Sequence, residues 1–168
     1  MENLKENTKR TGAHERIVGG HEASIADHPW QLAFELGGDQ RCGASLIGPS
    51  WALTAGHCVE DVHLYYLALR AGSSDPQRQR PVQAVDINVV DHETCRQVFV
   101  AVNAVTERMI CSGEFSRGVC IGDSGGPLVN NGTQVGIVSW GLGSCEVGLS
   151  VQTNVGYLRA WIRDTAGI

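Results

Sequence analysis

The sequence predicts an all-β fold, and three observations support this prediction. Glycine accounts for 21 of the 168 residues, well above its average usage of about 7%. Only 18% of the residues are charged, where about 25% is typical of soluble domains. From Ile17 onward, short apolar segments alternate with turn residues, which is the pattern of a β-sandwich or a β-barrel.

The expected strands lie, in chain order, at 30–36, 44–47, 51–55, 64–71, 82–90, 98–102, 126–129, 134–140 and 149–155. Between the seventh and the eighth lies Asn131-Gly132, the strongest short signal for a β-hairpin turn. With Thr133 the same residues form an N-glycosylation sequon, and the two interpretations are compatible. The polar stretch 73–81 is expected to be a loop.

A short C-terminal helix is expected after Asn154, a residue type that commonly caps helices. Behind it, apolar side chains recur at helical spacing, namely Tyr157, Leu158, Trp161 and Ile162. This is the one place where the periodicity favours a helix over a strand.

Charge and hydropathy exclude several classes of protein. The formal net charge is −5, and residues 17–168 carry nine arginines and no lysine against 15 acidic residues. An acidic body without basic clusters argues against binding to nucleic acid or to anionic membranes. No apolar run approaches the roughly 18 residues of a transmembrane helix, and residues 1–16 lack the apolar core of a signal peptide.

The six cysteines predict a disulfide framework made in an oxidising compartment. They are scattered, and no two form the C-x-x-C pair that is typical of zinc or redox sites. From the residues alone, fifteen pairings remain open. The six are Cys42, Cys58, Cys95, Cys111, Cys120 and Cys145.

Two segments point to acyl transfer. The first, 120–127, reads CIGDSGGP, and its glycines allow the backbone N–H groups of Gly122 and Ser124 to point at one substrate oxygen. A serine hydroxyl needs a base to take its proton, and the second segment, TAGHC, supplies His57. Read alone, the first could be a surface turn and His57 a structural histidine.

Together these motifs resemble the chymotrypsin/trypsin family of serine proteases. Further matching pieces occur in the order of the family: IVGG from Ile17, PW at 29–30, CGASLI at 42–47, MIC at 109–111, SWG at 139–141 and the closing helix with Trp161. The resemblance implies a double β-barrel with a C-terminal helix, divided into 17–80 for the N-terminal barrel and 81–168 for the C-terminal barrel. It also implies the disulfides Cys42–Cys58, Cys95–Cys111 and Cys120–Cys145.

The resemblance implies the roles of the site residues as well. Ser124 would be the nucleophile and His57 the general base, with Gly122 and Ser124 as the oxyanion hole. Residues 1–16 would be an activation segment, which we expect to be disordered. Cleavage after Arg16 would free the ammonium group of Ile17 to pair with Asp123 and so order the oxyanion loop.

The expected substrate pocket is uncharged. Gly118 occupies the position at the base where trypsin-like members carry an aspartate, and the walls would be formed by Ser139, Trp140, Gly141 and Ser150. A buried substrate cation would remain unpaired there, so we expect apolar or aromatic side chains to be preferred. The protein should therefore not cleave itself after Arg16.

The third member of the family's catalytic triad, an aspartate, has no counterpart. Asp86 resembles it locally but stands only 29 residues after His57 and close before Cys95, so we interpret it as structural. Asp61, Asp75 and Asp91 have less support. The spacing indicates that roughly 70 to 80 residues of the family's length are absent near 74–81, which leaves the first barrel incomplete.

Two functions therefore remain open at this stage. One is a secreted serine endopeptidase zymogen, and the other is a catalytically inactive homologue or shortened isoform that acts by binding. The expected partners are protein or peptide substrates, an activating trypsin-like protease and protein protease inhibitors. We expect a monomer that uses no cofactor or metal and that binds neither nucleic acid nor membranes.

Overall fold

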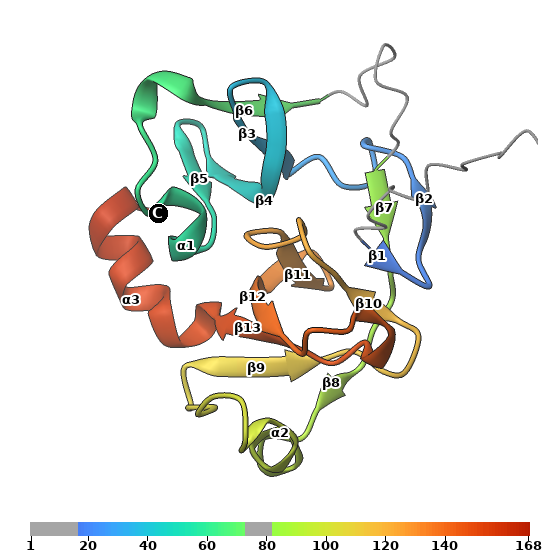
Figure 1. Cartoon of the computed structure of the whole chain (residues 1–168). Helices are drawn as coiled ribbons and strands as arrows, with labels where there is room; N and C mark the ends of the chain where they lie inside the picture. Colours follow the sequence, from blue (N-terminus) through green and yellow to red (C-terminus); the bar gives the residue numbers. More distant parts are fainter. Residues whose placement is uncertain (1–16, 73–81) are drawn as a thin grey trace, which may run out of the picture.

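The computed structural model describes residues 17–72 and 82–168, and within them all strand pairs are antiparallel (Figure 1). The N-terminal half forms a four-stranded sheet with the order β5-β4-β3-β6. Its strands are β3 (Gln31–Leu36), β4 (Asp39–Gly48), β5 (Trp51–Leu53) and β6 (Leu67–Ala71), the last preceded by the 3₁₀ turn η1 (Leu64–Tyr66). Between β5 and η1 lies the short helix α1 (Gly56–Val59).

The C-terminal half is built on a five-stranded sheet with the order β11-β12-β13-β9-β8. Its strands are β8 (Val89–Val90), β9 (Met109–Ser112), β11 (Pro127–Asn130), β12 (Thr133–Gly141) and β13 (Ser150–Asn154). The 3₁₀ turn η2 (Cys145–Val147) lies between the last two strands in the chain.

Two small sheets cross the predicted boundary at residue 80. β1 (Ile17–Val18) pairs with β10 (Gly118–Val119), and β2 (His21–Ala23) pairs with β7 (Val82–Ala84). The first residues of the described chain are thus tied to the C-terminal half.

The all-β fold class and the C-terminal helix are confirmed. The Asn131-Gly132 hairpin joins β11 to β12, and both residues have positive φ angles, 48° and 75°, as a two-residue turn of type I′ requires. Helix α3 (Val155–Ala166) begins behind Asn154, whose side-chain oxygen accepts a hydrogen bond of 3.2 Å from the Tyr157 N–H.

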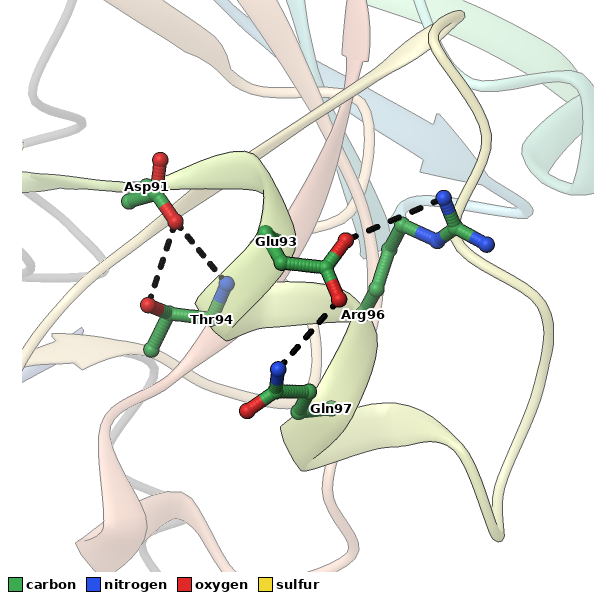
Figure 2. A network of polar contacts seen from close by, with 5 residues as sticks. All are labelled: Asp91, Glu93, Thr94, Arg96 and Gln97. Atoms are coloured by element: carbon green, nitrogen blue, oxygen red, sulfur yellow. Dashed lines mark hydrogen bonds and ion pairs between the residues drawn. The ribbon is translucent and has the colours of Figure 1, made fainter.

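The prediction of a strand at 98–102 is wrong, because helix α2 (His92–Phe99) and a turn occupy that region. Asp91 caps this helix by accepting hydrogen bonds from the N–H and the hydroxyl of Thr94, at 2.9 and 3.1 Å (Figure 2). Cys95 and Phe99, four residues apart, point into the core. The cap and this spacing were present in the sequence, but the alternating valines Val98, Val100 and Val102 indicated a strand instead.

Two apolar clusters hold the fold together. One joins α2 to the large sheet through Cys95, Phe99, Val105, Cys111 and Val151, with the Trp140 ring at 77° to that of Phe99 and 5.0 Å away. The other joins the two halves, because Phe34, Cys42, Ala55 and Cys58 from the N-terminal half pack with Ile137 of β12. The second cluster therefore fixes how the halves meet.

The N-terminal sheet is an open half-barrel, as expected of an incomplete first barrel. Near its β6 edge several large apolar side chains are exposed, among them Leu64 and Tyr65 at 80% and 83%. Open strand edges beside exposed apolar groups favour aggregation. Within the described ranges, the helices all fall short of the apolar length that a membrane crossing requires.

We predict that Phe99→Ala destabilises the protein by about 3–5 kcal/mol, because it empties a fully buried site and removes the ring contact to Trp140. Urea denaturation followed by tryptophan fluorescence measures this. The control is Val100→Ala at the neighbouring, 80% exposed position, which should change stability by less than about 0.5 kcal/mol. Equal effects of the two changes would contradict the α2 packing.

Candidate active site

The loop that carries Ser124 connects β10 to β11 and is fixed to β12. It turns through hydrogen bonds from the Asp123 N–H to the Cys120 carbonyl, 3.1 Å, and from the Gly126 N–H to the Asp123 carbonyl, 2.9 Å. Two further bonds attach it to Val138: the Gly125 N–H donates to the Val138 carbonyl at 2.7 Å, and the Val138 N–H donates to the Gly126 carbonyl at 2.9 Å. Ser124 is thus held at the edge of a rigid sheet.

A second set of contacts joins this loop to β4 in the other half. The Gly43 N–H donates to the Ser124 carbonyl at 2.8 Å, and the Thr54 hydroxyl donates to the Gly43 carbonyl, also at 2.8 Å. A Cβ on Gly43 would lie 2.9 Å from the Cα of Gly126, so glycine is needed for the two backbones to approach this closely.

His57 lies beside the same contact. It is the second residue of α1, directly after Gly56, and its side chain is exposed to solvent. Its neighbour Cys58 is bonded to Cys42, and the Cys58 sulfur lies 3.7 Å from the Ser124 carbonyl oxygen. The motif that carries His57 thus contacts the motif that carries Ser124, although Cys58 and Ser124 are 66 residues apart in the sequence.

The His57 ring also lies near both sulfurs of that disulfide, with the three potential ligand atoms within 4.8 Å of one another. Such a cluster has the residue types of a metal site. However, sulfurs consumed in a disulfide cannot act as thiolate ligands, so this arrangement does not fit a metal ion.

The N–H groups of Gly122 and Ser124 have no hydrogen-bond acceptor among the described residues. Gly122 and Gly125, on either side of the serine, have positive φ angles of 95° and 83°, and these shape the loop around it. Two free N–H donors flanking a serine are what an oxyanion hole requires.

The serine and the histidine are brought near one another but are not joined. Over residues 17–72 and 82–168, no hydrogen bond connects the Ser124 hydroxyl to the His57 ring, and no carboxylate forms an ion pair with that ring. The serine–histidine bond of an acyl-transfer site often tightens only when substrate binds. The missing carboxylate is a different matter, because its role is to orient the ring.

None of the weaker aspartate candidates fills that role. Asp86 is exposed between β7 and β8 in the C-terminal half, and Asp91 caps α2. Asp61 lies in the turn after α1 with a positive φ of 56°. Asp75 lies outside the described residues.

The region of the expected pocket is built largely from backbone. Gly118 is buried, and a Cβ there would lie 2.1 Å from the Gly148 carbonyl oxygen, so no side chain fits at this position without movement of the chain. Gly141 pairs with Ser150 across β12 and β13, and the register shifts between Val138 and Trp140. Gly148 is the residue of this region that sequence analysis missed, because its contact with Gly118 joins segments that are distant in the sequence.

Ser150 is buried rather than open to a pocket, and it belongs to a small polar cluster with Ser112 and Gln152. The Gln152 side-chain amide donates to the Ser150 hydroxyl at 2.7 Å, and that hydroxyl donates to the Ser112 carbonyl at 3.4 Å. The Ser112 hydroxyl and the Gln152 side-chain oxygen have no partner within the described part of the chain. Buried polar groups next to the pocket were not expected from the sequence.

At the expected activation site, Arg16 lies outside the described residues. Ile17 pairs with Val119, directly before Cys120, and the Asp123 carboxylate accepts a 2.8 Å hydrogen bond from the Cys120 N–H. The remaining disulfides are Cys95–Cys111, which ties α2 to β9, and Cys120–Cys145, which ties the serine loop to η2. These are the pairings that the resemblance implies.

Comparison with known proteins identifies the family. The model of the family described as Trypsin matches residues 17–81 and 66–162, which together cover most of the chain. The chain belongs to the trypsin family. As a member of that family it is a serine endopeptidase by resemblance.

Individual relatives have low sequence identity to this chain, but the alignments cover most of both chains. Hypodermin-B from Hypoderma lineatum is 29% identical over 224 residues, covering 90% of this chain and 88% of the relative. Trypsin 5G1 from Aedes aegypti is 27% identical over 229 residues, with 91% and 86% covered. Trypsin alpha from Drosophila melanogaster is 25% identical over 224 residues, with 90% and 88% covered.

These alignments support an internal gap in this trypsin-family chain. An alignment of 224 residues that uses 90% of a 168-residue chain leaves about 70 positions of the relative without a counterpart. The family match also divides into two pieces that overlap at 66–81, around the segment where the sequence predicts the gap.

We predict that Gly43→Ala destabilises the protein by about 1–3 kcal/mol, because the added methyl group forces the Ser124 loop away from β4. Thermal or urea denaturation measures the loss. Gly56→Ala is the matched control, since nothing lies within 4 Å of a Cβ at Gly56, and it should change stability by less than about 0.5 kcal/mol. A Gly43→Ala protein as stable as the control would contradict the close contact.

Proposed function

We propose that this protein hydrolyses peptide bonds through an acyl-enzyme, with Ser124 as the nucleophile and His57 as general base and then general acid. The observation that carries the proposal is the attachment of the Ser124 loop to β4 beside Cys58, where no other described residue accepts a hydrogen bond from the N–H groups of Gly122 and Ser124. The substrates would be proteins or peptides, as is general for the family.

The steps follow from these groups. The Ser124 oxygen attacks the substrate carbonyl carbon while His57 accepts the hydroxyl proton. The negative charge that develops on the carbonyl oxygen is stabilised by the N–H groups of Gly122 and Ser124. His57 then donates its proton to the leaving amine, and water attacks the acyl-enzyme by the same route, which frees Ser124.

Without a carboxylate to orient His57, turnover should be slow. In this family, loss of the function of the aspartate lowers kcat about 10⁴-fold, while the oxyanion hole and substrate binding retain about 10³–10⁴-fold acceleration over water. The enzyme we propose is therefore weak, unless residues outside the described part supply the missing carboxylate.

Activation by cleavage after Arg16 is part of the proposal. The pairing of Ile17 with Val119 keeps the new N-terminus close to the segment that leads into the serine loop. The freed ammonium group would pair with Asp123 and draw the neighbouring N–H groups into the oxyanion position. An ion pair of this kind acts as a switch, because its formation depends on the cut.

The disulfides support an extracellular location. We propose that the protein acts outside the cell, since three disulfides persist only in an oxidising environment and the relatives are trypsin-like proteases. An activating trypsin-like protease and protein protease inhibitors would be its partners there, and we propose a monomer.

The second candidate function is binding without catalysis. It is favoured by one observation: no carboxylate pairs with His57 among the described residues. Such a homologue would keep the fold and the peptide-binding surface of a protease while leaving the bond intact.

An active-site probe discriminates the two functions. After cleavage at Arg16, a fluorophosphonate should label Ser124, because the probe needs an activated serine and a formed oxyanion hole. Labelling should be at least tenfold slower in His57→Ala and in the uncleaved chain. His63→Ala, at a histidine that caps η1, is the matched control and should label like the parent. No labelling of folded, cleaved protein would support the binding function.

We predict that the activated protein cleaves after Phe, Tyr or Leu in preference to Arg, because Gly118 offers no carboxylate to a cationic side chain. Ester substrates that differ in this residue measure kcat/KM. Gly118→Asp should not produce a preference for Arg, since a Cβ there meets the Gly148 carbonyl at 2.1 Å. Faster cleavage of Arg substrates by the parent protein would contradict the proposed specificity.

A further inference from the structure

A hollow of about 570 Å³ opens in the C-terminal half, between β8, the start of α2 and β9. Asn154, the cap of α3, closes one side of it. In Figure 1, α2 lies at the bottom of the molecule and α1, which carries His57, lies higher up, and neither His57 nor residues 120–127 line the hollow. The hollow is therefore separate from the candidate active site.

Two carboxylates line the hollow from different elements: Asp91 comes from the start of α2, and Glu107 comes from the turn before β9. The Thr94 N–H and hydroxyl both donate to one oxygen of Asp91, which lowers the pKa of this carboxyl and keeps it ionised. The Glu93 backbone N–H and the neighbouring His92 lower the pKa of the same carboxyl further.

Among the described residues, neither acid forms a salt bridge with an arginine. Glu107 forms no ion pair there, and the guanidinium of its neighbour Arg108 lies over the Tyr157 ring, 5.3 Å from the ring centre. The third ionisable group in the hollow is His92. The Asn154 side-chain oxygen already accepts the Tyr157 N–H.

The rest of the lining is apolar. Val89 is 65% exposed although it is aliphatic and lies in a strand, and Met109 and Ile110 are half-buried beside it. A ligand suited to this surface has an aliphatic stem to cover Val89 and a cationic head to meet the carboxylates. Arginine side chains combine these properties, and their guanidinium group can bond to more than one carboxylate oxygen.

We propose that this hollow is a binding site for an arginine side chain presented by a peptide segment of a partner protein. The stem packs on Val89 and Ile110, and the guanidinium group binds the carboxylates of Asp91 and Glu107. The site is independent of catalysis. It offers basic peptides a charged contact on this acidic protein, whereas the uncharged pocket at Gly118 offers none.

The probe for this site is the peptide acetyl-Ala-Arg-Ala-amide, compared with its citrulline analogue, which has the same shape without the charge. Binding to the full chain is followed by backbone amide shifts in NMR titrations. The arginine peptide should bind at least about fivefold tighter than the citrulline peptide and should shift the amides of Val89 and Ile110. Equal binding of the two peptides, or shifts confined to the region of Gly118 and Gly141, would overturn the proposal.

Charge-removing variants of similar shape test the two carboxylates. Asp91→Asn keeps the helix cap, because asparagine caps as well as aspartate, and Glu107→Gln keeps the side-chain length. Each should weaken binding of the arginine peptide about threefold, and the double variant about tenfold, without changing the affinity for the citrulline peptide. Parent-like affinity in the double variant would overturn the proposal.

The matched control is Glu93→Gln on the same helix. Glu93 does not line the hollow and is turned toward Arg96 and Gln97, while Asp91 is turned toward Thr94 (Figure 2). The control should bind the arginine peptide like the parent, and an equal loss in it would point to general surface charge. Fluorophosphonate labelling of Ser124 should be unchanged in all these variants, so failure of this site and failure of the proposed catalysis are distinguishable.

Discussion

The hydrogen bond from the Gly43 N–H to the Ser124 carbonyl joins the N-terminal sheet to the loop that carries the proposed nucleophile. Around it lie the Thr54 hydroxyl, which holds the Gly43 carbonyl, and Cys58, whose neighbour is His57. Because His57 and Ser124 come from different halves of the chain, their relative position depends on this contact. The apolar cluster that packs Cys42 and Cys58 against Ile137 also stabilises the contact between the two halves.

This arrangement explains how a site can persist in a barrel that does not close. The contact depends on β4 and β12, and each of these strands has a neighbouring strand on both sides. The open edge lies at β6, which is separated from β4 by β3. An absence of later strands therefore exposes apolar side chains such as Leu64 without separating the serine loop from β4. The loss concerns the chemistry of the site, because no described carboxylate pairs with His57 to orient its ring.

Much of the fold could be predicted because its signals are local. The Asn131-Gly132 turn, the Asn154 cap and most strands follow from residues adjacent in sequence. Helix α2 was missed because Val98, Val100 and Val102 favour a strand locally and outweighed the Asp91 cap, and packing of Cys95 and Phe99 in the core stabilises the helix. Contacts between distant segments, such as Gly148 against Gly118 and the buried Gln152 cluster, leave no pattern in a single sequence.

Amide hydrogen exchange at Gly43 tests the central contact most directly. If its N–H is held by Ser124, it should exchange only on global unfolding, with protection comparable to that of the Val138 N–H, which is bonded to the same loop. Exchange of Gly43 at the rate of an exposed turn such as Gly132, in protein whose Val138 amide is protected, would show that the serine loop and β4 are not joined.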